Sequence, residues 1–172
     1  HDDVTVIGRP AELAEDGTPM SRVVLHVLSE KVGLRISDST MVALLQPTSP
    51  LRTSEDIRAS IQRVATSDVD LAMGVTEVDA GVLKFGRVMD GRFIPISDPE
   101  HCFANRQTLP PVVRPNGAVY AFQAGWFRQN GGFVTSRIAA IAMPPERSID
   151  VDTIQDFERV ERIFLEKREG AA

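Results

Sequence analysis

Short apolar runs alternate with amphipathic stretches along most of the chain. Four of the short runs are typical of strands in a buried sheet, namely residues 41–45, 68–75, 118–122 and 138–142. Three longer stretches repeat apolar residues at the spacing of one helix face, within residues 19–33, 53–64 and 154–167. Thr53 with Asp56, and Thr153 with Asp156, have the spacing of capping boxes at two of these helix starts.

Strands that alternate with helices indicate an α/β fold, in which helices cover both faces of a central sheet. We therefore expect one three-layer α/β/α domain over residues 1–172, with a mostly parallel sheet. A short strand is also predicted at residues 4–7, and Gly33 is predicted to end the first helix.

A β-hairpin interrupts this alternation in the middle of the chain. Residues 83–88 and 92–94 have strand-like composition, and Asp90-Gly91 between them favours a tight hairpin turn. Periodicity is then lost over residues 97–111. The segment 81–111 therefore indicates an excursion from the main sheet.

Composition narrows the class of protein. With 42% hydrophobic and 25% charged residues, the chain resembles a soluble globular protein with a core. Its net charge of -5 argues against nonspecific binding to nucleic acid or to an acidic membrane surface. The single cysteine, Cys102, excludes an internal disulfide framework and favours a reducing, cytoplasmic location. No apolar run reaches the roughly 18 residues of a membrane span, and no signal-peptide pattern is found at the start.

The strongest chemical signal is a pair of acids directly before the last predicted helix. Asp150 and Asp152 are two residues apart, so in an extended segment both carboxylates point to the same face. Neighbouring carboxylates repel unless a cation lies between them, and Mg²⁺ commonly takes one or two protein carboxylates together with substrate phosphates. The alternative is an acidic turn that precedes a helix, where negative charge is also favourable.

Two turns at strand ends are candidate binding loops. Residues 46–52 follow the first buried strand and contain two prolines, which stiffen the turn at the carboxyl end where open α/β sheets bind ligands. The alternative is an ordinary loop. Gly117 precedes the strand at 118–122, where it either allows a ligand to approach the backbone or simply makes the turn.

Several motifs occur together in a fixed order, at residues 9–16, 44–52, 106–110, 114–120 and 148–153. In that combination the chain resembles the acylneuraminate cytidylyltransferases, also called CMP-N-acetylneuraminic acid synthetases. The resemblance covers nearly the whole sequence and implies a Rossmann-like nucleotidyltransferase domain.

The resemblance also implies a reaction. Members of this family transfer CMP from CTP to the anomeric hydroxyl of a nonulosonic, sialic-acid-like sugar acid and release pyrophosphate, with Mg²⁺ as cofactor. The implied partners are CTP and an acidic nine-carbon sugar, without nucleic acid or membrane. A homodimer is implied as well, formed through residues 81–111, which would reach toward the partner's site.

The resemblance assigns roles to residues that match its motifs. Asp150 and Asp152 would hold Mg²⁺, and Arg106 would engage the acidic sugar during catalysis, since its planar fork suits a carboxylate. The other expected substrate-binding residues are Gln46, Lys84, Gln107, Asn116, Gly117, Tyr120 and Phe133. Phe133 matches the first residue of an aromatic pair, whereas the second is Val134 here. As alternatives, Arg106 is a surface arginine, Tyr120 a core residue and Gln46 a loop cap.

One family feature is missing from the sequence. A turn rich in glycine and basic residues, which would hold the CTP phosphates, is absent, and Gly8-Arg9-Pro10 does not replace it. Two explanations remain open. The chain is either a fragment of a full enzyme, or a truncated, non-catalytic homologue that binds an acidic sugar or nucleotide.

Overall fold

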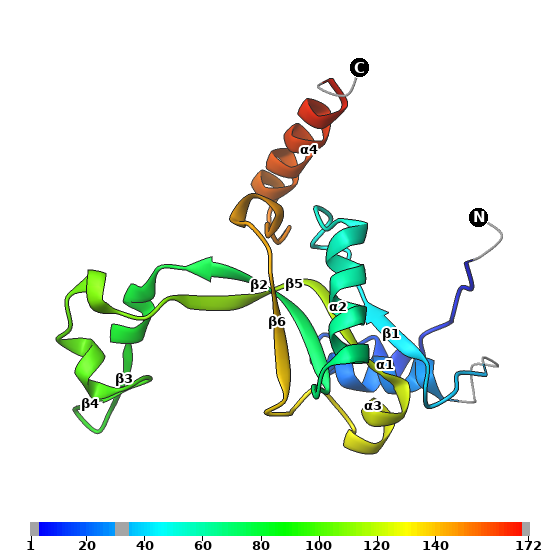
Figure 1. Cartoon of the computed structure of the whole chain (residues 1–172), viewed down its shortest axis with the longest axis horizontal. Helices are drawn as coiled ribbons and strands as arrows, with labels where there is room; N and C mark the ends of the chain where they lie inside the picture. Colours follow the sequence, from blue (N-terminus) through cyan, green and yellow to red (C-terminus); the bar gives the residue numbers. More distant parts are fainter. Residues whose placement is uncertain (1–3, 30–34, 170–172) are drawn as a thin grey trace.

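The computed structural model describes residues 4–29 and 35–169. Its main sheet contains four strands, which are β1 (Met41–Leu44), β2 (Leu71–Val78), β5 (Val112–Gln123) and β6 (Ile138–Ala142). The helices are α1 (Met20–Leu28), α2 (Ser54–Thr66), α3 (Ala124–Asn130) and α4 (Ile154–Glu169). A separate hairpin is formed by β3 (Gly86–Met89) and β4 (Arg92–Pro95) (Figure 1).

The sheet has the strand order β1-β5-β2-β6 and is mixed. β5 is antiparallel to both β1 and β2, whereas β2 and β6 are parallel. β1, β2 and β6 therefore run in one direction, and β5 runs against them. The prediction of a mostly parallel sheet holds for the direction of these three strands but not for their pairing. Because β5 separates β1 from β2, only the β2–β6 pairing is parallel within the described residues.

Helices cover both faces of the sheet, as the α/β prediction requires. On one face, Leu71 and Phe122 pack with buried residues of α1 and α3. On the other, Ala72 and Ala121 lie under the apolar side of α2. Successive strand residues thus point to opposite helical layers, which is the two-residue alternation of a β-strand.

Aromatic packing makes up the centre of the first layer. The rings of Phe122 and Phe127 are fully buried and stacked, with centroids 4.5 Å apart. Phe133 packs edge-on against both, at 5.8 and 4.8 Å. Burying a side chain of this size contributes about 1.5–3 kcal/mol, so this cluster anchors β5 to α3.

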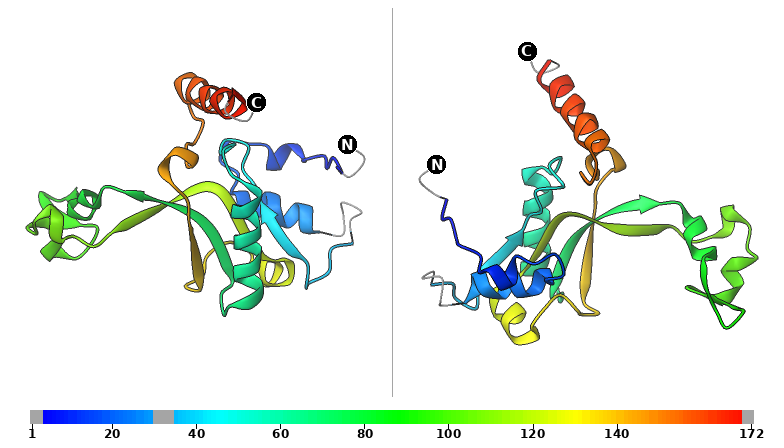
Figure 2. Two further views of the ribbon diagram at one scale, coloured as in Figure 1. Left: turned by 45° about the horizontal axis from the view of Figure 1, so that its top comes forward. Right: turned by 180° about the vertical axis from the view of Figure 1, so that it is seen from behind.

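β2 and β5 continue beyond the sheet as a two-stranded arm. β6 pairs with β2 only as far as Val75, after which β2 and β5 run on together to the Val78–Val112 pair. Their register shifts between Met73 and Val75, so the arm begins at this irregularity. Figures 1 and 2 show the arm projecting from the body, with β3 and β4 at its far end.

The hairpin in the arm has the expected turn. Asp90 and Gly91 both have positive φ, at 50° and 73°, which matches the right-handed twist of the flanking strands. Two short 3₁₀ helices, η4 (Pro99–Cys102) and η5 (Arg106–Thr108), follow the hairpin, where periodicity is lost in the sequence. The segment 81–111 is thus an extension beyond the sheet, and its part in dimerisation stays a prediction.

The predicted helix starts are confirmed, whereas the strand predicted at residues 4–7 is not found. Capping boxes form between Thr53 and Asp56 and between Thr153 and Asp156. Residues 4–7 are not a strand, because they have no ladder partner. Gly33 lies outside the described residues. None of the described helices is both long and apolar enough to span a membrane.

Candidate functional site

Two loops from opposite edges of the sheet meet over the middle of β5. One follows β1 and contains Gln46, and the other follows β6 and contains Asp150. The backbone N–H of Val151 donates to the carbonyl of Thr48 at 2.8 Å and joins the two loops. Since β1 and β6 run in the same direction, both loops lie at the carboxyl ends of their strands, where α/β sheets bind ligands.

Gly117 is the point at which the first loop rests on β5. It has a φ of 74°, and a Cβ atom there would lie 2.9 Å from Ser49 Oγ and closer still to Gln46 Oε1. The Gln46 side chain therefore packs directly on the glycine backbone. The sequence prediction placed both residues in one pocket, and the structure brings them into contact, although their role in binding stays a prediction.

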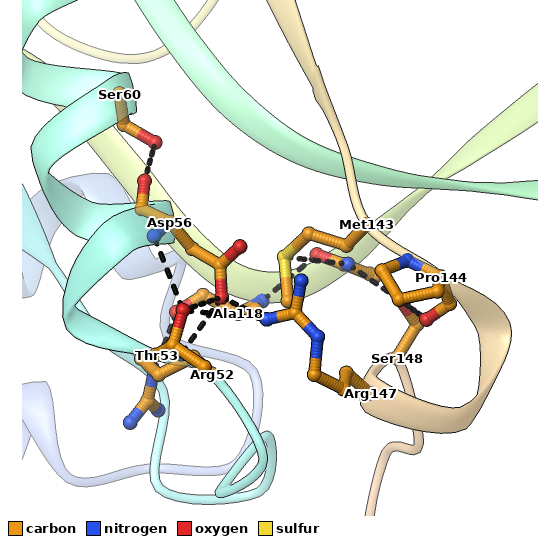
Figure 3. Close-up of polar contacts among 10 residues, drawn as sticks. Arg52, Thr53, Asp56, Ser60, Ala118, Met143, Pro144, Arg147 and Ser148 are labelled. Carbon is orange, nitrogen blue, oxygen red and sulfur yellow. Dashed lines mark hydrogen bonds and ion pairs between the residues drawn. The ribbon is translucent and has the colours of Figure 1, made fainter.

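Arg52 ties the same loop to the strand. Its guanidinium donates to the carbonyl of Ala118 (Figure 3), with Nε 2.7 Å from the oxygen. It also donates to the carbonyl of Gln46. Burial lowers the pKa of Arg52. This arginine thus replaces water as the partner of two backbone carbonyls and holds Gln46 in place.

Asn116, on β5, forms hydrogen bonds with both loops. Its Nδ2 donates to Ser148 Oγ at 2.9 Å, its Oδ1 accepts from the N–H of Ala118, and its backbone carbonyl accepts from Ser49 Oγ. The residue is only 1% exposed. The sequence prediction placed Asn116 in the wall of a substrate pocket. In the structure the amide is buried and its polar groups have partners within the chain, and its contact with a substrate stays a prediction.

Asp150 and Asp152 differ in their surroundings. Ile149 and Val151 pack with Leu51 and Val160, so the intervening Asp150 faces away from that apolar cluster. Its Oδ1 atom is buried and has no hydrogen-bond partner among the described residues. Asp152 is exposed.

A buried carboxylate oxygen without a partner is costly and calls for an explanation, such as a missing ion. The donor set fits Mg²⁺, which prefers carboxylate oxygens. The described residues hold no cluster of three or more His, Cys, Asp or Glu side chains suited to a metal. Asp150 and Asp152 would therefore supply only part of a coordination shell, and substrate oxygens and water would supply the rest.

Tyr120 packs against the aromatic core and is close enough to Asp150 to be affected by its charge. Burial raises the pKa of the Tyr120 hydroxyl, and the negative charge of Asp150 raises it further. The Tyr120 ring is 5.8 Å from that of Phe133, which itself packs against Phe122 and Phe127. Phe133 is thus largely a core residue here, and its predicted contact with substrate is untested. Val134 is 90% exposed.

Three of the predicted site residues lie on the arm instead. Lys84 Nζ donates to the carbonyl of Ala104 at 2.5 Å, and Arg106 pairs with Asp79. Gln107 is in the same 3₁₀ helix as Arg106. These three residues therefore lie on the segment 81–111, which was expected to reach toward the partner's site, and their roles in binding stay predictions.

The length of the arm sets this separation. Tyr120 is paired with Met73, whereas Arg106 lies beyond Val78. At about 3.3 Å per residue, the strand from 73 to 78 spans roughly 17 Å.

Sequence reasoning missed Arg147, which connects the second loop to α2. Its guanidinium forms an ion pair with Asp56 at the start of that helix (Figure 3). Burial tends to raise the pKa of Asp56, but hydrogen bonds from Arg147 and Thr53 outweigh it and leave the pKa lowered. The capping pattern identified Asp56, yet no local signal marks a partner 91 residues away.

An apolar groove adjoins the site. Its volume is about 460 Å³, and it lies between the loop after β1 and helix α4. The lining residues are Pro47, Thr48, Pro50, Val151, Phe157, Val160, Glu161, Phe164 and Leu165.

Comparison with known proteins identifies the relatives of the chain. No family model matches the sequence. Over 155 residues, or 90% of the chain, it is 32% identical to an N-acylneuraminate cytidylyltransferase of Streptococcus agalactiae serotype V. The chain is related to the N-acylneuraminate cytidylyltransferases. The enzyme of the same name from Escherichia coli O18:K1:H7 is 28% identical over 87% of the chain, so the resemblance predicted from the sequence is confirmed.

The matched region is only part of those relatives. The chain spans about a third of their length, 36% for the streptococcal protein and 35% for that of E. coli. A solved structure of CMP:2-keto-3-deoxy-manno-octonic acid synthetase complexed with CTP shares the fold, with a TM-score of 0.57 and 16% identity. It covers 88% of this chain and 70% of its own. The α/β nucleotidyltransferase fold is thereby confirmed.

Gly117→Ala tests the close approach at the first loop. The variant should lose more free energy of unfolding than Gly131→Ala, because both glycines have positive φ but only Gly117 is crowded. The φ penalty is about 1–2 kcal/mol for each. We expect a further loss of at least about 1 kcal/mol for Gly117→Ala, measured by urea unfolding. Equal losses in the two variants would contradict the contact with Gln46 and Ser49.

The pKa of Tyr120 tests the position of Asp150. Asp150→Asn should lower the Tyr120 pKa, because it removes the carboxylate charge that opposes tyrosinate, while burial keeps the pKa above its ordinary value. Tyr120 is the single tyrosine, so tyrosinate absorbance during a pH titration reports it alone. Asp152→Asn is the matched control and should leave the titration unchanged. An unchanged midpoint in Asp150→Asn would place Asp150 away from the ring.

Proposed function

We propose that the chain forms the sugar-binding and metal-binding part of a cytidylyltransferase. The enzyme would transfer CMP from CTP to the anomeric hydroxyl of a nonulosonic, sialic-acid-like sugar acid. The observation that carries this proposal is the buried oxygen of Asp150, which has no hydrogen-bond partner in the described part of the chain. Its loop is joined to the loop of Gln46 at the carboxyl ends of two strands. The relatedness to N-acylneuraminate cytidylyltransferases supports the substrate class.

The proposed reaction balances as a phosphoryl substitution. The anomeric oxygen of the sugar forms a bond to the α-phosphorus of CTP, while the bond from that phosphorus to the bridging oxygen breaks. Pyrophosphate leaves with the bonding electrons, and the hydroxyl proton passes to solvent or to a base. Such reactions depend mainly on positioning and on neutralising phosphate charge, with little covalent chemistry by the protein.

Asp150 and Asp152 would hold Mg²⁺, which supplies charge neutralisation to the phosphates when bound. Gln46 would hydrogen-bond the sugar from the loop after β1, where Arg52 fixes its backbone. Tyr120 would offer a hydroxyl donor close to Asp150, whose charge raises the pKa of that hydroxyl further than burial alone. Gln46, Tyr120 and Asp150 lie at the same end of the sheet, which supports a shared site.

The arm points to a second copy of the chain as the source of Arg106. Arg106 is 71% exposed on its side chain and lies roughly 17 Å or more along the arm from Tyr120. In a homodimer, the arm of one protomer would bring Arg106, Lys84 and Gln107 to the site of its partner. The exposed apolar residues on the arm support such contact; they are Phe85, Val88, Met89, Phe93, Ile94, Ile96 and Phe103.

A second candidate function is a non-catalytic module that binds an acidic sugar or a nucleotide. It is favoured by the absence of a turn rich in glycine and basic residues for the CTP phosphates within these 172 residues. On either proposal the protein would act in a reducing compartment such as the cytoplasm, which the single cysteine supports.

Turnover separates the two functions. In the complete protein that carries this chain, Asp152→Asn should reduce Mg²⁺-dependent pyrophosphate release by at least about 100-fold, because a charge-neutralising ligand is lost. The substrates are CTP and N-acetylneuraminic acid, and circular dichroism checks that the fold is kept. Glu158→Gln, an exposed acid on α4, is the control and should keep full activity.

Unchanged turnover in Asp152→Asn would remove the metal assignment. The 172-residue chain alone should be much less active, since it lacks the expected turn for the triphosphate. Binding of N-acetylneuraminic acid without dependence on Mg²⁺, together with no pyrophosphate release by the complete protein, would favour the non-catalytic module.

Placing a charged side chain on the apolar surface of the arm tests whether the arm forms the dimer interface. Val88 and Phe93 are cross-strand neighbours, both largely exposed, and Phe103 is 91% exposed. Phe103→Asp or Val88→Asp should convert the dimer to a monomer in sedimentation velocity, since a buried charge is costly. Val134→Asp, equally exposed but outside the arm, should leave the dimer intact. A monomeric wild-type chain, or a dimer that resists both arm variants, would count against the arm interface.

A further inference from the structure

The segment that carries Asp150 is fixed to three different elements. Before Asp150, the side chain of Arg147 reaches α2 and that of Ser148 reaches β5. After it, the N–H of Val151 donates to Thr48 in the loop that follows β1. Asp150 therefore lies in a short stretch of backbone anchored on both sides.

Among the ion pairs of the described residues, the one between Arg147 and Asp56 is the most buried. Arg147 belongs to the short 3₁₀ helix η6 (Pro145–Arg147), and its side chain is 24% exposed, while that of Asp56 is 7% exposed. Arg147 Nη1 also lies 3.4 Å from Thr53 Oγ1 (Figure 3). The ion pair thus joins the loop after β6 to the first turn of α2.

Helix α2 does not need this arginine for its cap. Asp56 Oδ2 accepts hydrogen bonds from the N–H and the hydroxyl of Thr53, at 2.7 and 2.8 Å. Asp56 therefore keeps two partners if Arg147 is removed. The ion pair with Arg147 therefore connects α2 to the segment of Asp150, and the helix cap does not depend on this connection.

Asp150 cannot fix the position of its own buried oxygen. Oδ1 has no hydrogen-bond partner among the described residues, so the backbone anchors decide where that atom lies. A metal ligand usually relies on outer contacts of this kind for its orientation, and losing one typically costs 10–100-fold in metal affinity.

We propose that Arg147 is a positioning residue for Asp150, and that its ion pair with Asp56 holds the carboxylate where a divalent cation binds. The inference rests on the proposed role of Asp150 as a cation ligand. Arg147 acts through the backbone of the loop and does not itself touch the cation.

Manganese binding tests the inference, with free Mn²⁺ measured by electron paramagnetic resonance during titration of the chain. Asp150→Asn should abolish the site. Arg147→Met should bind Mn²⁺ about 10-fold more weakly than the wild type. Asp56→Asn, which keeps a capping acceptor and removes the ion pair, should weaken binding to a similar extent. Combining the two changes should add little to either alone, because they break the same contact.

A matched control separates positioning from general loss of stability. Arg137 pairs with Asp68 and Asp70 directly before β6, at the opposite end of that strand. Arg137→Met should lower the thermal midpoint without changing Mn²⁺ affinity. Arg147→Lys, which restores the positive charge, should recover most of the affinity.

Four results would overturn the inference. They are wild-type affinity in either Arg147→Met or Asp56→Asn, equal weakening in Arg137→Met, and failure of Arg147→Lys to recover binding. If Arg147→Met does not fold, Asp56→Asn decides the outcome. Absence of an Asp150-dependent site in the wild type would instead show that the proposed function has failed, and the inference with it.

Discussion

The site depends on one buried residue, Asn116, which links two loops that belong to opposite edges of the sheet. Its backbone carbonyl accepts from Ser49 Oγ in one loop, and its side-chain Nδ2 donates to Ser148 Oγ in the other. The Val151–Thr48 hydrogen bond closes the same junction. Since Asn116 lies on β5, the central position of that strand brings Gln46 and Asp150 to a common end of the sheet.

Charge is distributed unevenly around this junction. The guanidinium of Arg52 donates to backbone carbonyls, and that of Arg147 forms an ion pair with Asp56. Neither arginine therefore neutralises Asp150, whose buried oxygen has no partner within residues 4–29 and 35–169. Buried charges are stable only when they are paired or bind a metal. This imbalance is what makes a cation at Asp150 a physical expectation as well as a family resemblance.

The arm separates the predicted sugar-binding residues Lys84, Arg106 and Gln107 from the sheet. A β-strand is stiff and extended, so continuing β2 and β5 past the end of β6 carries their connecting segment well away from the body (Figure 2). The cationic side chains of Lys84 and Arg106 belong to this connecting segment and therefore also lie away from the body. A site assembled from one protomer's loops and another's arm would let the same extension serve both dimer formation and recognition of an acidic sugar.

Local patterns were sufficient for much of the fold. The capping boxes at Thr53 and Thr153, the Asp90-Gly91 turn and the apolar run of β6 depend on neighbours within a few residues, and all lie where they were predicted. Residues 4–7 do not form a strand. Their apolar composition suits one, but a strand also needs a hydrogen-bonded neighbour, and these residues have none in the sheet.

The sequence by itself determined the elements, the α/β class and the relatedness to N-acylneuraminate cytidylyltransferases. Only the tertiary structure decided that β5 runs against its neighbours, that Asn116 is buried, and that Arg147 pairs with Asp56. It also decided that Arg106 lies apart from Asp150. The reason is that these outcomes depend on contacts between residues far apart in the chain, which leave no periodic or local trace in the order of the amino acids.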